Sequence, residues 1–216
     1  HEVRSMSDYA NRAKERLGRA PLPGDTIAEV LRDLRIRTVD VPSGFSTGVA
    51  DRLRGHGITV HAADGSLFPE RQRKRPDEIK HIVRAMRDTE AGMQAAIDLL
   101  RRAKIRGGWV VLDGKKLTAE DVRRAANVEI FTRGCIPAHT IVAPGKHGCD
   151  PHDVGSGPIR AGEPVIIDIF PRSEKTGYFA DITRTVVKGK PGPEARMMYD
   201  AVLAAQRGAL KMIRHG

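Results

Sequence analysis

The chain has 216 residues, of which 40% are hydrophobic, which is enough for the core of one large domain or two smaller ones. Its formal net charge is +10, and only 4% of its residues are aromatic. No apolar run approaches the roughly 18–20 residues that cross a bilayer, and the start of the chain has no apolar signal-peptide centre, so we expect a soluble cytoplasmic protein.

Residues 1–75 are predicted to form an α/β unit, because helix-like and strand-like segments alternate along them. No glycine-rich phosphate loop follows either strand, so nothing there indicates nucleotide binding. In chain order, the predicted elements are a polar helix near 7–17, a helix in TIAEVLRDL (26–34), a strand in IRTVDVP (36–42), a helix in GVADRLRGHG (48–57) and a strand in ITVHAA (58–63).

A second domain is predicted over residues 76–216, after the proline-containing basic stretch SLFPERQRKRPDEI. A long helix should begin at Pro76, because apolar residues recur at intervals of three and four as far as Leu100. GWVVLDG (108–114) predicts a strand that runs into a turn, and Thr118 and Asp121 have the spacing of a helix capping box. From about residue 127 to 190 the sequence favours strands, and a last helix should follow Pro193.

Two acidic residues, Asp168 and Asp181, interrupt strand-like runs in VIIDIF and GYFADITRT. A buried isolated charge is costly, so we expect a positive partner nearby. If 165–170 and 178–187 form a hairpin whose turn is centred between Glu174 and Lys175, Asp168 faces Asp181. The same register pairs Ile166 with Thr183 and Phe170 with Phe179, and alternation places all six on one face.

Directly opposed residues have Cβ atoms about 4.5–5.5 Å apart, which suits a pair of cations about 3.5–4 Å apart. Two divalent ions would turn a repulsive carboxylate pair into a favourable one. The alternatives are that one aspartate faces solvent or pairs with Arg184, or that one of them is protonated.

His152 lies in the loop GKHGCDPHDVGSGP just before the first aspartate strand. A histidine there could stabilise an oxyanion or move a proton, although a lone loop histidine commonly does neither. Two cysteines and three histidines cluster locally in the sequence, but they match no standard zinc spacing and are interpreted as ordinary reduced residues: Cys135, Cys149, His139, His147 and His152.

The basic residues fall in short runs, RQRKR (71–75), RRAKIR (101–106) and Arg123–Arg124. A basic balance can indicate nucleic-acid binding, but no run is interleaved with the aromatics that make a stacking platform. The runs also lie at the edges of helix-like segments, where solvated charge is the commoner explanation. We therefore do not expect a nucleic-acid partner.

The motifs TIVAPG, PHD, GEPVIIDIF and GYFADITRT, followed by VVKGKPGPEARMMYDAVLAAQ, together resemble the first half of the catalytic domain of the pita-bread metallopeptidases. RKRPDEIKHIVRAMRDTE resembles the helix that opens this domain in the Xaa-Pro peptidase (prolidase) branch. Residues 1–75 fit, more loosely, the C-terminal part of that branch's N-terminal creatinase-like α/β domain. The implied fold class is α/β (α+β).

The resemblance implies a peptidase that cleaves an N-terminal Xaa-Pro bond with water activated by two divalent ions, Mn²⁺ being favoured over Co²⁺, Zn²⁺ or Fe²⁺. Asp168 and Asp181 correspond to metal ligands, and His152 to a catalytic residue that stabilises the tetrahedral intermediate. The expected partners are a peptide substrate and, as an option left open, a second copy in a homodimer, without a membrane.

Two departures from the family pattern matter. The gap between the aspartates is about two residues longer than in the family's usual hairpin. One extra residue in each arm of the hairpin accounts for this length and keeps both aspartates on the same face of the sheet. The family's remaining ligands, a His and two Glu, come from the later half of the domain, so we expect the 216 residues alone to be inactive. Two rival hypotheses are a non-catalytic pita-bread module that binds peptides or histones, and a creatinase-like amidinohydrolase.

Overall fold

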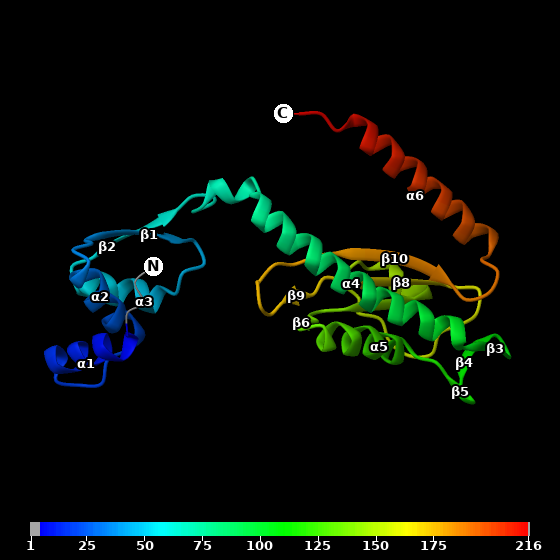
Figure 1. Cartoon of the computed structure of the whole chain (residues 1–216), viewed down its shortest axis with the longest axis horizontal. Coiled ribbons are helices and arrows are strands. Elements are labelled where there is room, and N and C mark those ends of the chain that lie inside the picture. Colours follow the sequence, from blue (N-terminus) through cyan, green and yellow to red (C-terminus); the bar gives the residue numbers. More distant parts are fainter. Residues whose placement is uncertain (1–4, 216) are drawn as a thin grey trace. The chain divides into compact units, whose positions relative to one another are not determined.

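The computed structural model describes residues 5–215, which divide into two compact units, one ending at Arg73 and one starting at Lys74 (Figure 1). The predicted mixture of helices and strands is confirmed in both units. No helix within residues 5–215 is long and apolar enough to cross a bilayer. Residues 1–4 lie outside the described range. The expectation that the chain starts without a signal peptide falls partly on these residues.

The first unit is built around a βαβ arrangement. Its elements are α1 (Met6–Leu17), α2 (Pro23–Asp33), β1 (Thr38–Pro42), α3 (Thr47–Gly55), β2 (Thr59–Ala63) and a 3₁₀ turn η1 (Pro69–Gln72). β1 and β2 are parallel, with Thr38 beside Thr59, because α3 carries the chain back between them. A small core formed by Ala28, Ala50, Leu53, Ile58 and Val60 holds these elements together. The five elements predicted from the sequence before residue 64 are therefore confirmed.

Asp25 and Glu29 are buried in this first unit, and arginine side chains lie beside both carboxylates. Asp25 is 1% exposed, and Arg19 Nη1 and His56 Nε2 lie 3.1 Å and 2.8 Å from its oxygens. Burial raises the pKa of Asp25, but hydrogen bonds from His56, the Leu22 N–H and Arg19 outweigh it and hold the pKa well below its ordinary value. The charged form of Asp25 therefore stabilises this unit.

The second unit combines the three helices α4, α5 and α6 with small antiparallel sheets. Its elements are α4 (Pro76–Arg102), β3 (Lys104–Arg106), β4 (Trp109–Leu112), β5 (Lys115–Lys116), α5 (Ala119–Thr132), β6 (Cys135–Ile136), β7 (Ile141–Pro144), η2 (Gly145–Cys149), β8 (Pro164–Ile169), β9 (Arg172–Ser173), β10 (Ile182–Val187) and α6 (Pro193–Met212). The central sheet has the order β10–β8–β7, and two smaller sheets have the orders β3–β4–β5 and β6–β9.

Helices α4 and α5 cover one face of the central sheet, where α4 contacts β8 and β10 and α5 contacts β7 (Figure 1). β8 alternates strictly, with Val165, Ile167 and Ile169 buried in the core and the residues between them half-exposed. The two helices pack closely at Gly92, where an added Cβ would lie 2.5 Å from Ile130 Cγ1. One face of the sheet is thus closed by helices, and the aspartates belong to the other.

The ends of the helices follow the sequence signals. The capping box of α5 is confirmed, because Thr118 Oγ1 accepts from the Asp121 N–H at 3.2 Å and Asp121 Oδ2 accepts from the Thr118 N–H at 3.1 Å. The predicted last helix is confirmed as α6, in which no residue is buried. Its apolar side chains, such as Val202 at 68% exposure, pack against no core in the described residues.

Candidate active site

The hairpin that carries the two aspartates is formed, but in a register two residues away from the predicted one. Asp168 pairs with Thr183 and Ile166 with Thr185, while Phe179 bridges to Arg172. The turn is centred one residue later than predicted, because Gly177 adopts φ +75° at its end and the Ser173 N–H donates to the Tyr178 carbonyl oxygen at 2.9 Å. The predicted direct pairing of Asp168 with Asp181 is therefore wrong.

The shift of two residues nevertheless keeps both aspartates on one face of the sheet. Asp181 lies two positions before Thr183, the partner of Asp168, so it is a diagonal neighbour of Asp168 on the same side. This side is opposite the core residues of β8, and Asp168 is half-buried there while Asp181 is exposed. The expectation of two buried carboxylates is thus wrong, because α4 and α5 cover only the other face.

The two carboxyl groups are close enough to influence each other. The pKa of Asp181 is raised, first by partial burial of its carboxyl group and then by the charge of Asp168 and a hydrogen bond with it. Thr183 Oγ1 donates to Asp168 Oδ1 at 2.5 Å. No ion pair within residues 5–215 joins Arg184 to either aspartate, and Arg184 Nη1 donates instead to the Thr183 carbonyl oxygen.

Thr183 was not singled out from the sequence, although a signal for it was present. In a strand, residues two apart share a face, so the D-x-T spacing already placed the Thr183 hydroxyl beside the aspartates. A hydroxyl that donates to one carboxylate oxygen fixes the orientation of that carboxylate.

The donor set on this face fits divalent cations as part of a site. Carboxylate oxygens are ligands that Mn²⁺ and similar ions accept. Burial, and then the charge of Asp168, raises the pKa of Asp181, and a bound cation would offset both effects. Within the described chain no group of three or more His, Cys, Asp or Glu residues is placed to hold a metal ion. Asp168 and Asp181 are thus two potential ligands, and a complete metal centre would require others.

The loop that carries His152 folds over the face on which the aspartates lie. An added Cβ at Gly148 of η2 would lie 2.8 Å from Ile166 Cδ1, and Ile166 is two residues from Asp168 on the same side of β8. His152 follows η2, is exposed, and its backbone N–H donates to Asp150 Oδ1 at 2.8 Å. The structure thus places the His152 loop on the aspartate side, and the imidazole forms no hydrogen bond or ion pair with another described residue.

Arg123 of α5 holds this loop in place. Its Nε donates to the Thr140 carbonyl oxygen at 3.0 Å, and its Nη2 donates to the carbonyl oxygens of Val154 and Gly155, the latter at 2.7 Å. The sequence placed Arg123 in a solvated basic pair, so this role was missed. Only the fold brings α5 beside carbonyl groups about thirty positions away, and no local pattern encodes such a contact.

The cysteines and histidines of the suspected cluster lie on different elements. Cys135 is buried in β6, and burial followed by the nearby Asp88 carboxylate raises the pKa of its thiol. Cys149 is exposed at the end of η2, and His147 Nδ1 is 2.7 Å from Asp153 Oδ2.

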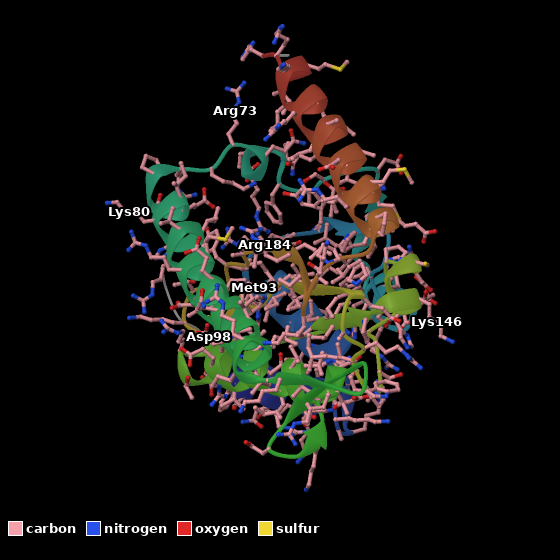
Figure 2. All side chains as sticks on the ribbon, turned by 90° about the vertical axis from the view of Figure 1, so that its right-hand side faces the viewer. Arg73, Lys80, Met93, Asp98, Lys146 and Arg184 are labelled. Carbon is pink, nitrogen blue, oxygen red and sulfur yellow. The ribbon has the colours of Figure 1, made fainter. Side chains whose placement is uncertain are left out.

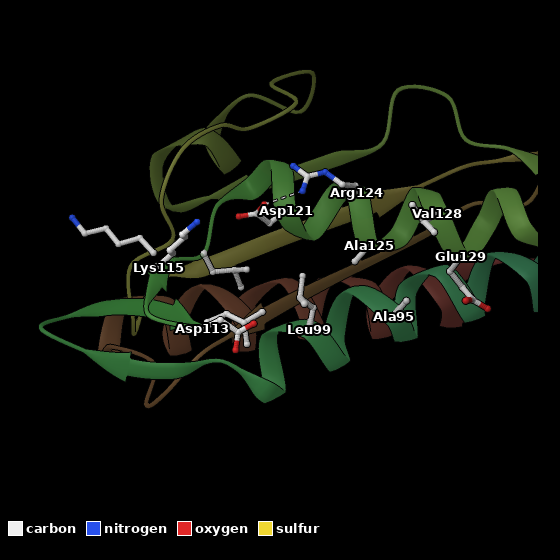
Figure 3. A pocket seen from close by; sticks show the side chains of 12 residues that line it. Ala95, Leu99, Asp113, Lys115, Asp121, Arg124, Ala125, Val128 and Glu129 are labelled. Carbon is white, nitrogen blue, oxygen red and sulfur yellow. Dashed lines mark ion pairs between the residues drawn. The ribbon is translucent and has the colours of Figure 1, made fainter.

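A larger pocket of about 640 Å³ lies between α4, α5 and the β4–β5 turn (Figure 3). Leu99, Ala125 and Val128 contribute apolar surface, and Lys115 and Arg124 contribute charge at its edge. None of its lining residues comes from β8 or β10, so this pocket is separate from the aspartates.

The structure is thus that of a mixed α/β protein with a helix-backed antiparallel sheet and a pair of aspartates on the open face of that sheet. The profile of metallopeptidase family M24 matches residues 80–216, and the chain belongs to this family. The resemblance to the pita-bread peptidases is thereby confirmed.

The most informative relatives are Xaa-Pro peptidases. The chain is 38% identical over 197 residues to the Xaa-Pro dipeptidase of Pyrococcus furiosus, covering 89% of this chain and 52% of that protein. It is 27% identical over 206 residues to Xaa-Pro aminopeptidase 1 of Streptomyces coelicolor, covering 90% of this chain and 39% of the relative. The solved prolidase of Pyrococcus horikoshii superposes with a TM-score of 0.69 at 28% identity, over 85% of this chain and 50% of that chain. The chain thus spans about half the length of these relatives or less.

Proposed function

We propose that the protein containing this chain is a metal-dependent peptidase that hydrolyses an N-terminal Xaa-Pro bond. Membership of family M24 and the names of the similar dipeptidase and aminopeptidase support this proposal. The observation that carries it is the placement of Asp168 and Asp181 on one open face, where burial and then the charge of Asp168 raise the pKa of Asp181. Residues 1–75 would be the end of the N-terminal domain and residues 76–216 the first half of the catalytic domain.

In this proposal Asp168 and Asp181 hold two divalent ions, with Mn²⁺ favoured and Co²⁺, Zn²⁺ or Fe²⁺ as alternatives. The ions, when bound, supply Lewis acidity toward the peptide carbonyl and lower the pKa of water. Thr183 orients the Asp168 carboxylate through its hydrogen bond. His152, on the loop above the same face, donates a hydrogen bond to the oxyanion that develops on the peptide.

The test uses the complete protein with an Xaa-Pro dipeptide and an Xaa-Pro tripeptide in the presence of Mn²⁺. Asp168→Asn should lower kcat/KM well over 100-fold, because even the loss of groups that only orient metal ligands costs about 10–100-fold. Asp113→Asn is the matched control, since Asp113 is remote from β8 and has φ +48°, which asparagine tolerates. This control should keep activity within about twofold.

The 216-residue chain by itself should neither hydrolyse these peptides nor bind two equivalents of Mn²⁺. Equal activity of Asp168→Asn and the parent would refute the metal-ligand role. A complete protein that carries no metal and cleaves no peptide would favour the peptide-binding module instead. Cleavage of creatine without cleavage of peptides would favour the amidinohydrolase.

A further inference from the structure

We propose a second ligand site, for a small zwitterion such as a free amino acid, in a pocket beside β7 and η2. This inference goes beyond the proposed peptidase reaction and needs neither metal nor catalysis. The pocket has a volume of about 300 Å³, at the lower end of the roughly 300–1,000 Å³ that small-molecule sites occupy. It is lined by Trp109, Pro144, Lys146, His147, Ser156, Pro158, Arg160 and Glu163.

The Arg160 guanidinium is held in position before any ligand binds. Its Cζ lies 4.3 Å from the centre of the Trp109 ring, and Lys116 Nζ lies 4.0 Å from the same centre. Both cations are therefore within the distance at which a cation is attracted to an aromatic ring. The contact with Trp109 favours a fixed orientation of the Arg160 side chain.

The backbone on both sides of Arg160 is also anchored. The Val110 N–H donates to the Ile159 carbonyl oxygen and the Ala161 N–H donates to the Gly108 carbonyl oxygen, both at 3.0 Å. These bonds attach the segment before β8 to the β4 strand that carries Trp109. A preorganised cation loses less conformational entropy when it binds a ligand than a freely rotating one does.

Within residues 5–215, Lys146, Arg160 and Glu163 of this pocket have no oppositely charged partner. Neither Lys146 nor Arg160 forms an ion pair or a side-chain hydrogen bond there, and the Glu163 carboxylate has none either. Glu163 is only half-exposed, and its Oε2 would lie 2.5 Å from a Cβ added to Gly145, so its carboxylate packs against the loop. By contrast, His147 is held by Asp153 at 2.7 Å.

This set of charges selects the class of ligand. A simple anion would be attracted by Lys146 and Arg160 but repelled by Glu163. A simple amine would be attracted by Glu163 but repelled by Lys146 and Arg160. A zwitterion satisfies both, with its carboxylate toward Lys146 and Arg160 and its ammonium group toward Glu163. The Ser156 hydroxyl and the His147 ring add further hydrogen-bonding groups to the wall.

The pocket is accessible from solvent. Figure 2 shows Lys146 at the margin of the second unit, on the opposite side of the view from Lys80 of α4. Lys146 and Arg160 are exposed, so the expected affinity is modest.

The experiment is calorimetric titration of the metal-free 216-residue chain with glycine, β-alanine and 4-aminobutyrate, whose two charges are increasingly separated. The controls are propionate, propylamine and inorganic phosphate, each of which carries charge of one sign only. Saturable binding of at least one amino acid, tighter than that of every one of these controls, is expected. Glu163→Gln should weaken amino-acid binding about fivefold or more and strengthen propionate binding, because it removes the repulsion of anions.

Lys146→Gln should weaken amino-acid and propionate binding alike, and it leaves the Trp109 stack intact where Arg160→Gln could disturb it. Glu174→Gln and Lys175→Gln, in the exposed hairpin turn, are the matched controls and should change nothing. Asp168→Asn should also bind normally, which separates this site from the proposed metal centre. No saturable binding of any amino acid, tighter binding of phosphate or propionate than of amino acids, or an unchanged affinity in Glu163→Gln would overturn the proposal.

Discussion

Gly155 lies where the His152 loop passes directly over the backbone of β7. A Cβ added there would be 1.8 Å from the Val142 carbonyl oxygen and 2.7 Å from Ala143 Cα. These are backbone atoms in the central sheet, so they cannot rotate away as a flexible side chain would. Gly155 also has φ +76°, a conformation that a residue with a side chain adopts at a cost. Gly155→Ala should therefore separate the loop from the sheet.

The expected loss of stability has three parts. The left-handed backbone costs about 1–2 kcal/mol and the steric overlap about 1–3 kcal/mol. Displacement also breaks the 3.0 Å bond from the Val142 N–H to the Val154 carbonyl oxygen, worth about 0.5–1.5 kcal/mol. Together they amount to about 3–6 kcal/mol, a large share of the ~5–15 kcal/mol that stabilises a typical domain.

Gly157→Ala supplies the matched control, because Gly157 has φ +75° but no atom within 4 Å of an added Cβ. Only the backbone contribution of about 1–2 kcal/mol should be lost there. Trp109 is the single tryptophan of the chain and belongs to the second unit, so its fluorescence during urea denaturation reports on that unit. If the two variants lost the same free energy of unfolding, the close approach of Gly155 to β7 would be refuted.

Three other substitutions test the site and the first unit. Thr183→Val removes the hydrogen bond to Asp168 and should weaken Mn²⁺ binding by the complete protein about tenfold in an equilibrium titration. Thr185→Val is the control, and equal Mn²⁺ affinities of the two variants would contradict the orienting role of Thr183. Arg123→Met removes two hydrogen bonds to the His152 loop and one to the Thr140 carbonyl oxygen. It should accelerate hydrogen exchange in residues 150–157 more than Arg124→Met does, whereas unchanged exchange would show that the loop needs no support from α5. Folding lowers the pKa of Asp25, so its contribution to stability is present above the unfolded pKa of about 3.9 and is lost as the pH falls below that value. Asp25→Asn should therefore reduce the loss of stability of the first unit at acid pH, measured by hydrogen exchange in that unit. An unchanged dependence on pH would argue against the charged form.

The hairpin shows which structural features the sequence pattern could predict and which it could not. Alternation placed Asp168 and Asp181 on one face, and that prediction survives because a shift of two residues preserves the face. The pairing failed because it depends on the turn, and Gly177 with φ +75° moved the centre of the turn by one residue. A glycine at the end of a polar turn was the signal that could have corrected it.

Burial on the aspartate face could not be predicted from β8 alone. A strand with three core residues on one side does not show what covers its other side, and here α4 and α5 lie only on the core side. The residues between the core positions are therefore half-exposed.

The sequence by itself determined the features that depend on near neighbours: the helices, the Thr118–Asp121 capping box, the βαβ order of the first unit and the shared face of the two aspartates. Each of these follows from contacts within a few residues or from the period of a strand. The tertiary structure alone decided the contacts of Arg123 with the His152 loop and the charges around Trp109 and Arg160. Those groups are tens of residues apart in the chain, and only the packing of α5 and β4 against the central region brings their side chains together.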